Sequence, residues 1–158
     1  ELLRLDYFFN RMRSSSGSQE QVWGAEVMAK LSLQPSEYWA RQCHVGASFI
    51  RPMEMGVRHQ VGVDRIMWGS DYPHKEASSP YSREAIALAF AGVPKHEAEM
   101  MLSLNAAKLY GFDLDLLRPI ADRIGPKVDE VFAGLPPRSV PIDANMCPAF
   151  AGYEFATE

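Results

Sequence analysis

The sequence is poor in cysteine and has no long hydrophobic run. Only Cys43 and Cys147 occur among 158 residues, too few for a disulfide framework, and their spacing matches neither a metal knuckle nor a redox pair. No stretch approaches the roughly 20 consecutive apolar residues that span a bilayer. The first residues, from Glu1 to Arg4, lack the pattern of a secretory signal. We therefore expect a cytoplasmic protein with no membrane partner.

Positive charge is also scarce and scattered. Sixteen Lys and Arg residues stand against 20 Asp and Glu, which gives a formal net charge of −4, and no basic cluster is longer than Arg11-Met12-Arg13. This balance argues against nucleic acid as a partner. Hydrophobic residues make up 47% of the chain and charged residues 23%, the proportions of a globular protein with a packed core.

The first 40 residues predict helices separated by a polar loop. Leu2, Leu5 and Phe9 recur at helical spacing with no capping residue before them, so we expect the chain to begin inside a helix of a longer protein. Residues 14–18 are small and polar and predict a surface loop. Pro35 is typical of the first turn of a short helix.

The middle of the chain predicts a strand, a helix and a second strand. Apolar runs over 44–50 and 65–68 read as buried strands. Residues 52–61 form a helical pattern between them, with Pro52 at its start and Gly62 just past its end. Such a crossover pairs its strands in parallel and places helices against the sheet.

Helices are predicted beyond the second strand. Pro80 is expected at the first position of a helix whose stripe of Ile86, Ala89, Phe90 and Val93 packs on the sheet. Residues 95–110 are also predicted helical and end at a glycine.

The last part of the chain is rich in proline. Pro119 is expected to break or delay the following helix, and Pro126 to open another. Residues 134–158 hold four prolines and no sustained period, so we expect an irregular tail there, separate from a domain over 1–133.

One acidic residue stands where parallel α/β folds bind their ligands. Asp71 follows the second predicted strand, between Gly69 and Pro73, and ligands of such folds bind at the carboxyl ends of the strands. A carboxylate held there can ligate a divalent cation and accept a proton from metal-bound water. The alternative is structural, because an aspartate in a Gly/Pro loop often caps a turn by binding backbone amides.

The segment around Asp71 resembles the last barrel strand of the amidohydrolase-related proteins, which include metal-dependent hydrolases and enzymes similar to aminocarboxymuconate-semialdehyde decarboxylase. Further similarity covers most of the chain up to about residue 131. The segments that carry it are Pro35-Ser36-Glu37-Tyr38, Asp64 to His74, Asn105 to Phe112 and Ile120 to Pro126.

This resemblance implies a (β/α)₈ barrel with a metal site at the carboxyl ends of its strands. Asp71 matches the aspartate after strand eight, which in the family ligates the metal or serves as the base. The implied cofactor is a divalent ion, zinc or else manganese or iron. The family's other ligands are a His-x-His or Glu-x-His pair after strand one and histidines after strands five and six. The four histidines of this chain contain no His-x-His pair, so those ligands are expected from upstream.

Two further residues are candidates for binding a small-molecule substrate. His74 shares a loop with Asp71 and could contact substrate or orient the site. Arg51 follows the first strand and could bind a substrate carboxylate through its planar guanidinium, although a structural salt bridge explains it equally well. Asn105 is expected to cap or brace a helix junction. His44, His59 and His96 fall at a strand start or in helices and are not expected to be ligands.

A complete barrel needs about 250 residues and at least about 200, so the chain predicts only the last two strands of one, followed by helices and the tail. Two strands leave a sheet edge and apolar surface uncovered, which favours a homo-oligomer or association with the N-terminal part of the barrel. The intact protein is expected to hydrolyse a C–N or C–O bond or to decarboxylate a small carboxylic acid, and the isolated chain to be inactive. The alternative is a non-catalytic α/β module that serves subunit association.

Overall fold

The computed structural model describes residues 30–133 and 147–150. The chain divides into two compact units, residues 1–44 and residues 45–158. The helix and loop predicted over the first 29 residues lie outside the described part. Within that part, no helix is both long and apolar enough to cross a membrane.

The first unit contributes helix α4, Pro35–Gln42. Pro35 stands at its first position, as predicted, where the missing amide hydrogen costs no helical hydrogen bond. The carboxylate of Glu37 accepts a hydrogen bond from the backbone amide of Gln34 at 2.7 Å, which satisfies an amide at the helix start that has no helical partner.

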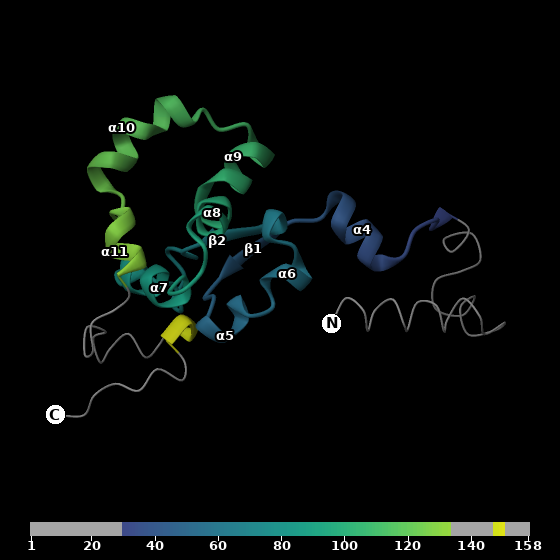
Figure 1. Ribbon diagram of the computed structural model, residues 1–158, viewed down its shortest axis with the longest axis horizontal. Coiled ribbons are helices and arrows are strands. Elements are labelled where there is room, and N and C mark those ends of the chain that lie inside the picture. Colours follow the sequence, from purple (N-terminus) through teal and green to yellow (C-terminus); the bar gives the residue numbers. More distant parts are fainter. Residues whose placement is uncertain (1–29, 134–146, 151–158) are drawn as a thin grey trace. The chain divides into compact units, whose positions relative to one another are not determined.

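The second unit contains the predicted strand–helix–strand motif (Figure 1). Strands β1 (Val45–Ser48) and β2 (Ile66–Gly69) pair in parallel, with Val45 opposite Ile66 and Ser48 opposite Gly69. The single helix predicted between them is two short ones, α5 (Pro52–Met55) and α6 (Arg58–Val61), followed by a 3₁₀ turn over Val63–Arg65. Gly62 has a φ of 102° and ends α6 as predicted, in a conformation that favours glycine.

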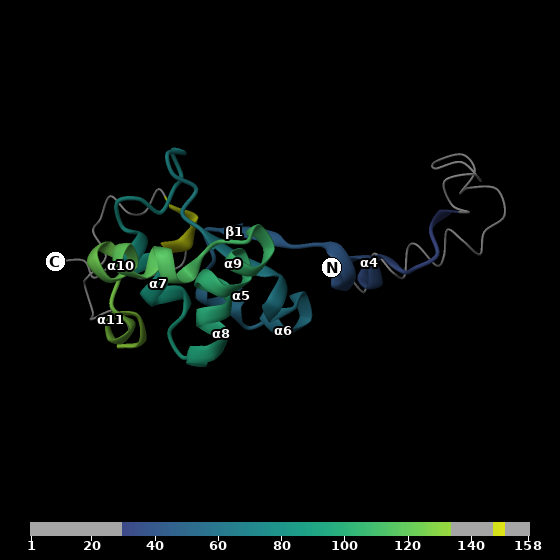
Figure 2. The ribbon, with the colours of Figure 1, turned by 90° about the horizontal axis from the view of Figure 1, so that it is seen from above.

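The two faces of this sheet have different surroundings. Val45, Ala47 and Trp68 pack with the buried Ile66 into the main core. Side chains alternate along a strand, so Gly46, Ser48 and Met67 belong to the opposite face, where Gly46 is exposed and Met67 is buried. Figure 2 shows α6, α8 and α11 on one side of β1. One face of the sheet is therefore covered by helices, as in one segment of a barrel wall.

Three helices after β2 build the core. These are α7 (Ser82–Ala89), α8 (Lys95–Glu99) and α9 (Asn105–Tyr110), the last two joined by a π-helical turn over Met100–Leu104. The predicted stripe is confirmed, since all four of its residues are buried: Ile86, Ala89, Phe90 and Val93.

The start predicted for α7 is wrong. The helix begins at Ser82 instead of Pro80. The residues before Ser82 belong to the preceding loop. The backbone amide of the buried Ser78 donates to the carbonyl of Ser70 at 3.0 Å, and the Ser78 hydroxyl lies 2.9 Å from the Ser82 hydroxyl. Because these hydrogen bonds hold Ser78 in the loop, the helix begins later than predicted, at Ser82.

Asn105 is the predicted brace. Its side-chain amide donates hydrogen bonds to the carbonyl oxygens of Val63 and Ile66, both at 2.8 Å. Asn105 is buried, and Ile66 is the first residue of β2. The start of α9 is thereby bonded to the start of the strand that leads to Asp71.

The helices after α9 differ from the prediction at Pro119, which was expected to break or delay a helix, and at Pro126, which was expected to open one. Helix α10 runs over Leu114–Ile124 with Pro119 inside it. The carboxylate of Asp113 caps its start by accepting from the amides of Asp115 and Leu116, both at 3.0 Å, and none of its residues is buried. Solvent can therefore satisfy the carbonyl that Pro119 leaves without a donor.

Helix α11 covers Val128–Phe132 and begins two residues after Pro126. The carboxylate of Glu130 accepts a hydrogen bond from the backbone amide of Lys127 at 3.0 Å. This bond satisfies an amide ahead of the helix and fixes its start at Val128.

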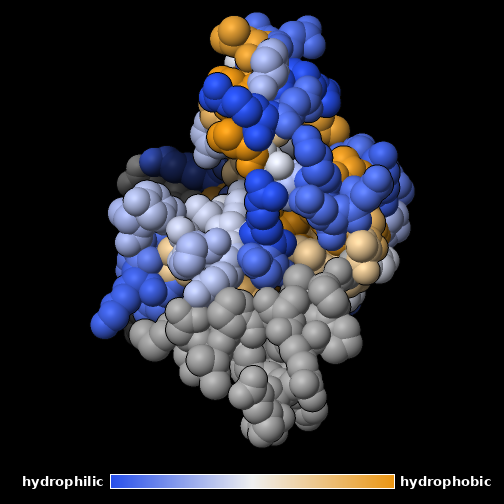
Figure 3. Space-filling view, turned by 90° about the vertical axis from the view of Figure 1, so that its left-hand side faces the viewer, coloured by the Kyte–Doolittle hydropathy of each residue, from blue (hydrophilic) through white to orange (hydrophobic). Residues whose placement is uncertain are grey.

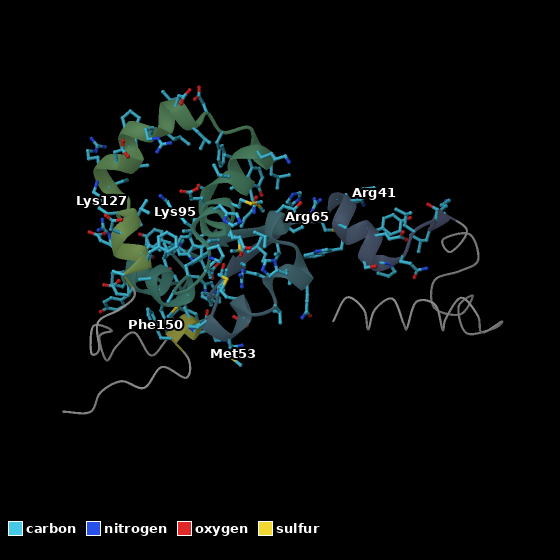
Figure 4. The ribbon with its side chains drawn as sticks, viewed as in Figure 1. Arg41, Met53, Arg65, Lys95, Lys127 and Phe150 are labelled. Carbon is cyan, nitrogen blue, oxygen red and sulfur yellow. The ribbon has the colours of Figure 1, made fainter. Side chains whose placement is uncertain are left out.

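Of the tail, the structure describes residues 147–150. They include a short 3₁₀ helix, Pro148–Phe150, which lies beside α7 (Figure 4). Cys147, Ala149 and Phe150 form a second buried cluster with Ala85 of α7. This part of the predicted irregular tail is thus anchored on the body of the unit.

A largely buried ion pair joins α6 to α8. The guanidinium of Arg58 donates from Nε to Glu97 at 2.6 Å, and His59 Nε2 lies 3.5 Å from the same carboxylate. The hydrogen bond from Arg58 is the main reason that the pKa of Glu97 lies below its ordinary value of 4.5.

We expect this pair to make the protein less stable in acid. Because the folded-state pKa of Glu97 is lowered, its contribution is complete above about pH 4.5 and is lost as the pH falls through the folded-state value. Urea unfolding across this range should show Glu97→Gln with a weaker dependence on pH than the unchanged protein. Glu99→Gln, at a half-exposed position on the same helix, is the control and should retain the full dependence. Equal slopes for all three proteins would contradict the assignment.

Candidate active site

Asp71 lies two residues beyond the carboxyl end of β2. Its φ of 59° is left-handed, a conformation that aspartate tolerates better than most residues. The loop that follows closes on itself, because the carbonyl of Ser70 accepts from the backbone amide of Ser78, and the carbonyl of Asp71 accepts from the amide of His74 at 2.8 Å. The loop holds Asp71 by its backbone.

The Asp71 carboxylate has no role in capping this turn. Within the described part of the chain no backbone amide donates to it, and the amide of Tyr72 donates to the hydroxyl of Ser70 instead, at 3.3 Å. The carboxylate is partly exposed, and its contact is with His74, whose Nδ1 lies 3.6 Å from Oδ2. The structural alternative for Asp71 therefore finds no support in these contacts.

His74 lies between two carboxylates. Its Nδ1 closely contacts the carboxylate of Glu76 and also faces that of Asp71. Both acids compete for the same ring nitrogen, and Nε2 has no partner among the described residues. The structure thus brings together Asp71 and His74, as predicted, and adds Glu76 as a neighbour.

Arg51 follows β1, at the same edge of the sheet as Asp71. Its Nη2 donates to Glu54 Oε1 at 2.8 Å, while Glu54 Oε2 accepts from the backbone amide of Arg51 at 2.9 Å. The hydrogen bond to Glu54 raises the pKa of the guanidinium, and the same contact lowers the pKa of Glu54. The salt bridge considered for Arg51 is therefore formed. A guanidinium has five N–H donors, so donors remain for a substrate carboxylate.

The metal-ligand set is incomplete in the described residues. They contain no group of three His, Cys, Asp or Glu side chains that could hold a metal ion. His44 precedes β1, and His59 and His96 lie in helices α6 and α8, as predicted. Asp71 supplies an oxygen donor suited to a divalent cation, and further ligands would have to come from outside these residues.

A hollow of about 590 Å³ lies between the helices and the sheet. Trp68, Leu102 and Phe132 line its apolar part, with Arg118 and Asp122 of α10 at its border. None of Asp71, His74 and Arg51 lines it. The sequence places Trp68 beside Asp71, but the alternation of side chains along β2 turns the indole toward the helices.

Comparison with known proteins gives one match. A family model described as Amidohydrolase matches residues 11–112, nearly two thirds of the chain. No curated protein and no solved structure matches. The matched range contains both strands, the loop of Asp71 and the brace of Asn105, and so the chain belongs to the amidohydrolase family.

Proposed function

We propose that this chain supplies Asp71 as metal ligand and general base to a metal-dependent enzyme. The amidohydrolase match implies a TIM-barrel type of α/β fold and an enzymatic function that usually uses a divalent metal. The observation that carries the proposal is the Asp71 carboxylate, which is fixed at the strand end by its backbone and accepts no backbone amide of residues 30–133 and 147–150. This carboxylate, beside His74 at the end of the strand, supports a role for Asp71 in the chemistry.

The rest of the barrel is proposed to come from outside these residues. Strands β1 and β2 would be its last two strands. The covered face of the sheet, with Ile66 and Trp68, corresponds to the outer wall, and the face with Gly46 and Ser48 to the interior. Upstream strands beside β2 would close the barrel and bring the remaining ligands to Asp71.

The proposed reaction is hydrolysis of a C–N or C–O bond or decarboxylation of a small carboxylic acid. A bound zinc, manganese or iron ion would supply Lewis-acid chemistry. In hydrolysis, Asp71 would accept a proton at a carboxylate oxygen and return it to the leaving group. In decarboxylation, Arg51 would bind the substrate carboxylate with donors not used by Glu54, and Asp71 or a histidine would deliver a proton to the carbon that loses CO₂. In either case His74 would contact substrate or orient Asp71.

Removal of the metal tests this proposal. The protein should be expressed with everything upstream of Glu1 and assayed on small amides, esters and carboxylic acids. Dialysis against a chelator should abolish turnover, and one of zinc, manganese or iron should restore it, because the reaction depends on the ion. The 158-residue chain alone should show no turnover. Undiminished activity after complete metal removal would refute the proposal.

A further inference from the structure

Helix α10 carries an apolar stripe that nothing in the described part of the chain covers. Leu116, Ile120 and Ile124 are spaced four residues apart and are 72%, 46% and 62% exposed. Each step of four residues advances about 40° around a helix, so the three side chains share one side. Figure 3 shows hydrophobic residues among hydrophilic ones over the upper part of the molecule, where α10 lies in Figure 1.

The stripe points away from the body of its own unit. Arg118 and Asp122 of α10 line the hollow against the helices and the sheet. At about 100° per residue these two side chains lie roughly opposite the stripe. A surface helix normally turns its apolar side inward, whereas the side of α10 at the hollow carries Ala121 and two exposed charged side chains, and the stripe lies on the other side.

The charges of α10 differ between its two ends. Asp113 and Asp115 lie at its start, while Arg123 is in its last turn. Two such helices side by side attract each other when antiparallel and repel when parallel. The acidic start of one then lies beside the basic end of the other.

We propose that α10 binds α10 of a second copy of this chain, antiparallel, across a two-fold axis near Ile120. The axis places Leu116 of each copy against Ile124 of the other, because both lie four residues from Ile120 within α10. The stripe is thus self-complementary, as an isologous interface requires. The inference is independent of the function proposed for Asp71.

Cross-linking tests the register. In the full chain with Cys43→Ser, Ile120→Cys should link two copies through a short bifunctional maleimide, because the two side chains meet at the axis. Met53→Cys is the control, since Met53 is 73% exposed on α5, far from α10 (Figure 4). It should give little linked dimer. Equal linking at both positions would indicate unspecific association and would overturn the proposal. No linking at position 120 would indicate that other parts of the chain cover the stripe, and would overturn it as well.

Sedimentation tests the energetics. Leu116→Glu should weaken dimerisation at least about thirty-fold, as expected for a central apolar contact, while Met53→Glu should leave the dimer unchanged. Arg123→Glu should also weaken the dimer, because the acidic start of one helix then lies beside an acidic end of the other. Asp113→Asn should then restore it, because asparagine removes the charge and still caps α10. Circular dichroism reports whether each variant is folded. A folded Leu116→Glu protein that dimerises like the unchanged protein would overturn the proposal.

Discussion

Replacing Asp71 with asparagine in the intact protein is expected to lower kcat about 10³-fold. The exchange removes the charge that would hold the metal and the base that would accept a proton, and loss of general base catalysis alone costs about 10² to 10⁴. Stability should change little, because asparagine also tolerates the left-handed φ of 59° at this position. Steady-state kinetics and urea unfolding of the same preparation separate the two effects.

The matched control for this exchange is Asp64→Asn. Asp64 lies in the 3₁₀ turn before β2, and its side chain is more than half exposed beside Arg65. It is the same kind of residue at the opposite end of the same strand, so turnover should be unchanged. If Asp71→Asn keeps the turnover of the unchanged protein, Asp71 is not the base.

Replacing Asn105 with alanine is expected to reduce the free energy of unfolding by about 3 kcal/mol. The exchange removes one buried and one partly buried hydrogen bond and leaves the carbonyls of Ile66 and Val63 without this donor, and an unsatisfied buried polar group costs roughly 1 to 3 kcal/mol. Aspartate should be no better, because a carboxylate only accepts hydrogen bonds and would face two carbonyl oxygens. Urea unfolding of the full chain measures the loss.

Ser103→Ala is the control for Asn105. The hydroxyl of Ser103 donates to the carbonyl of Glu99 at an exposed position in the preceding turn, so its loss should cost less than about 0.5 kcal/mol. An Asn105→Ala protein as stable as this control would show that the two bonds of Asn105 do not hold α9 to β2.

Helices and strands whose ends or buried sides depend on residues close by in the sequence could be predicted from the sequence. Pro52 and Gly62 bound the helical segment between the strands, because proline fixes its own φ and glycine tolerates the positive φ that ends a helix. The stripe around Phe90 identifies the buried side of α7 by spacing alone. Asn105 was predicted as a brace, but its partners lie 42 and 39 residues away, so only the structure identifies them.

The features that depend on distant contacts or on solvent could not be predicted. Pro119 is tolerated because α10 is exposed, which its local sequence does not reveal. At the site, the shared loop of Asp71 and His74 was visible in the sequence. The contact of Glu76 with His74 and the choice of Glu54 as partner of Arg51 required the folded loops. Local spacing predicts elements, whereas the partners of charged side chains depend on the tertiary structure.

The metal content of the intact protein tests the central claim most directly. Mass spectrometric analysis of the protein purified with everything upstream of Glu1 should find at least one divalent ion per chain. Asp71→Asn should lower that content markedly, and Asp64→Asn should leave it unchanged. An intact, folded protein without stoichiometric metal, or one whose metal content is the same with and without Asp71, would contradict the account.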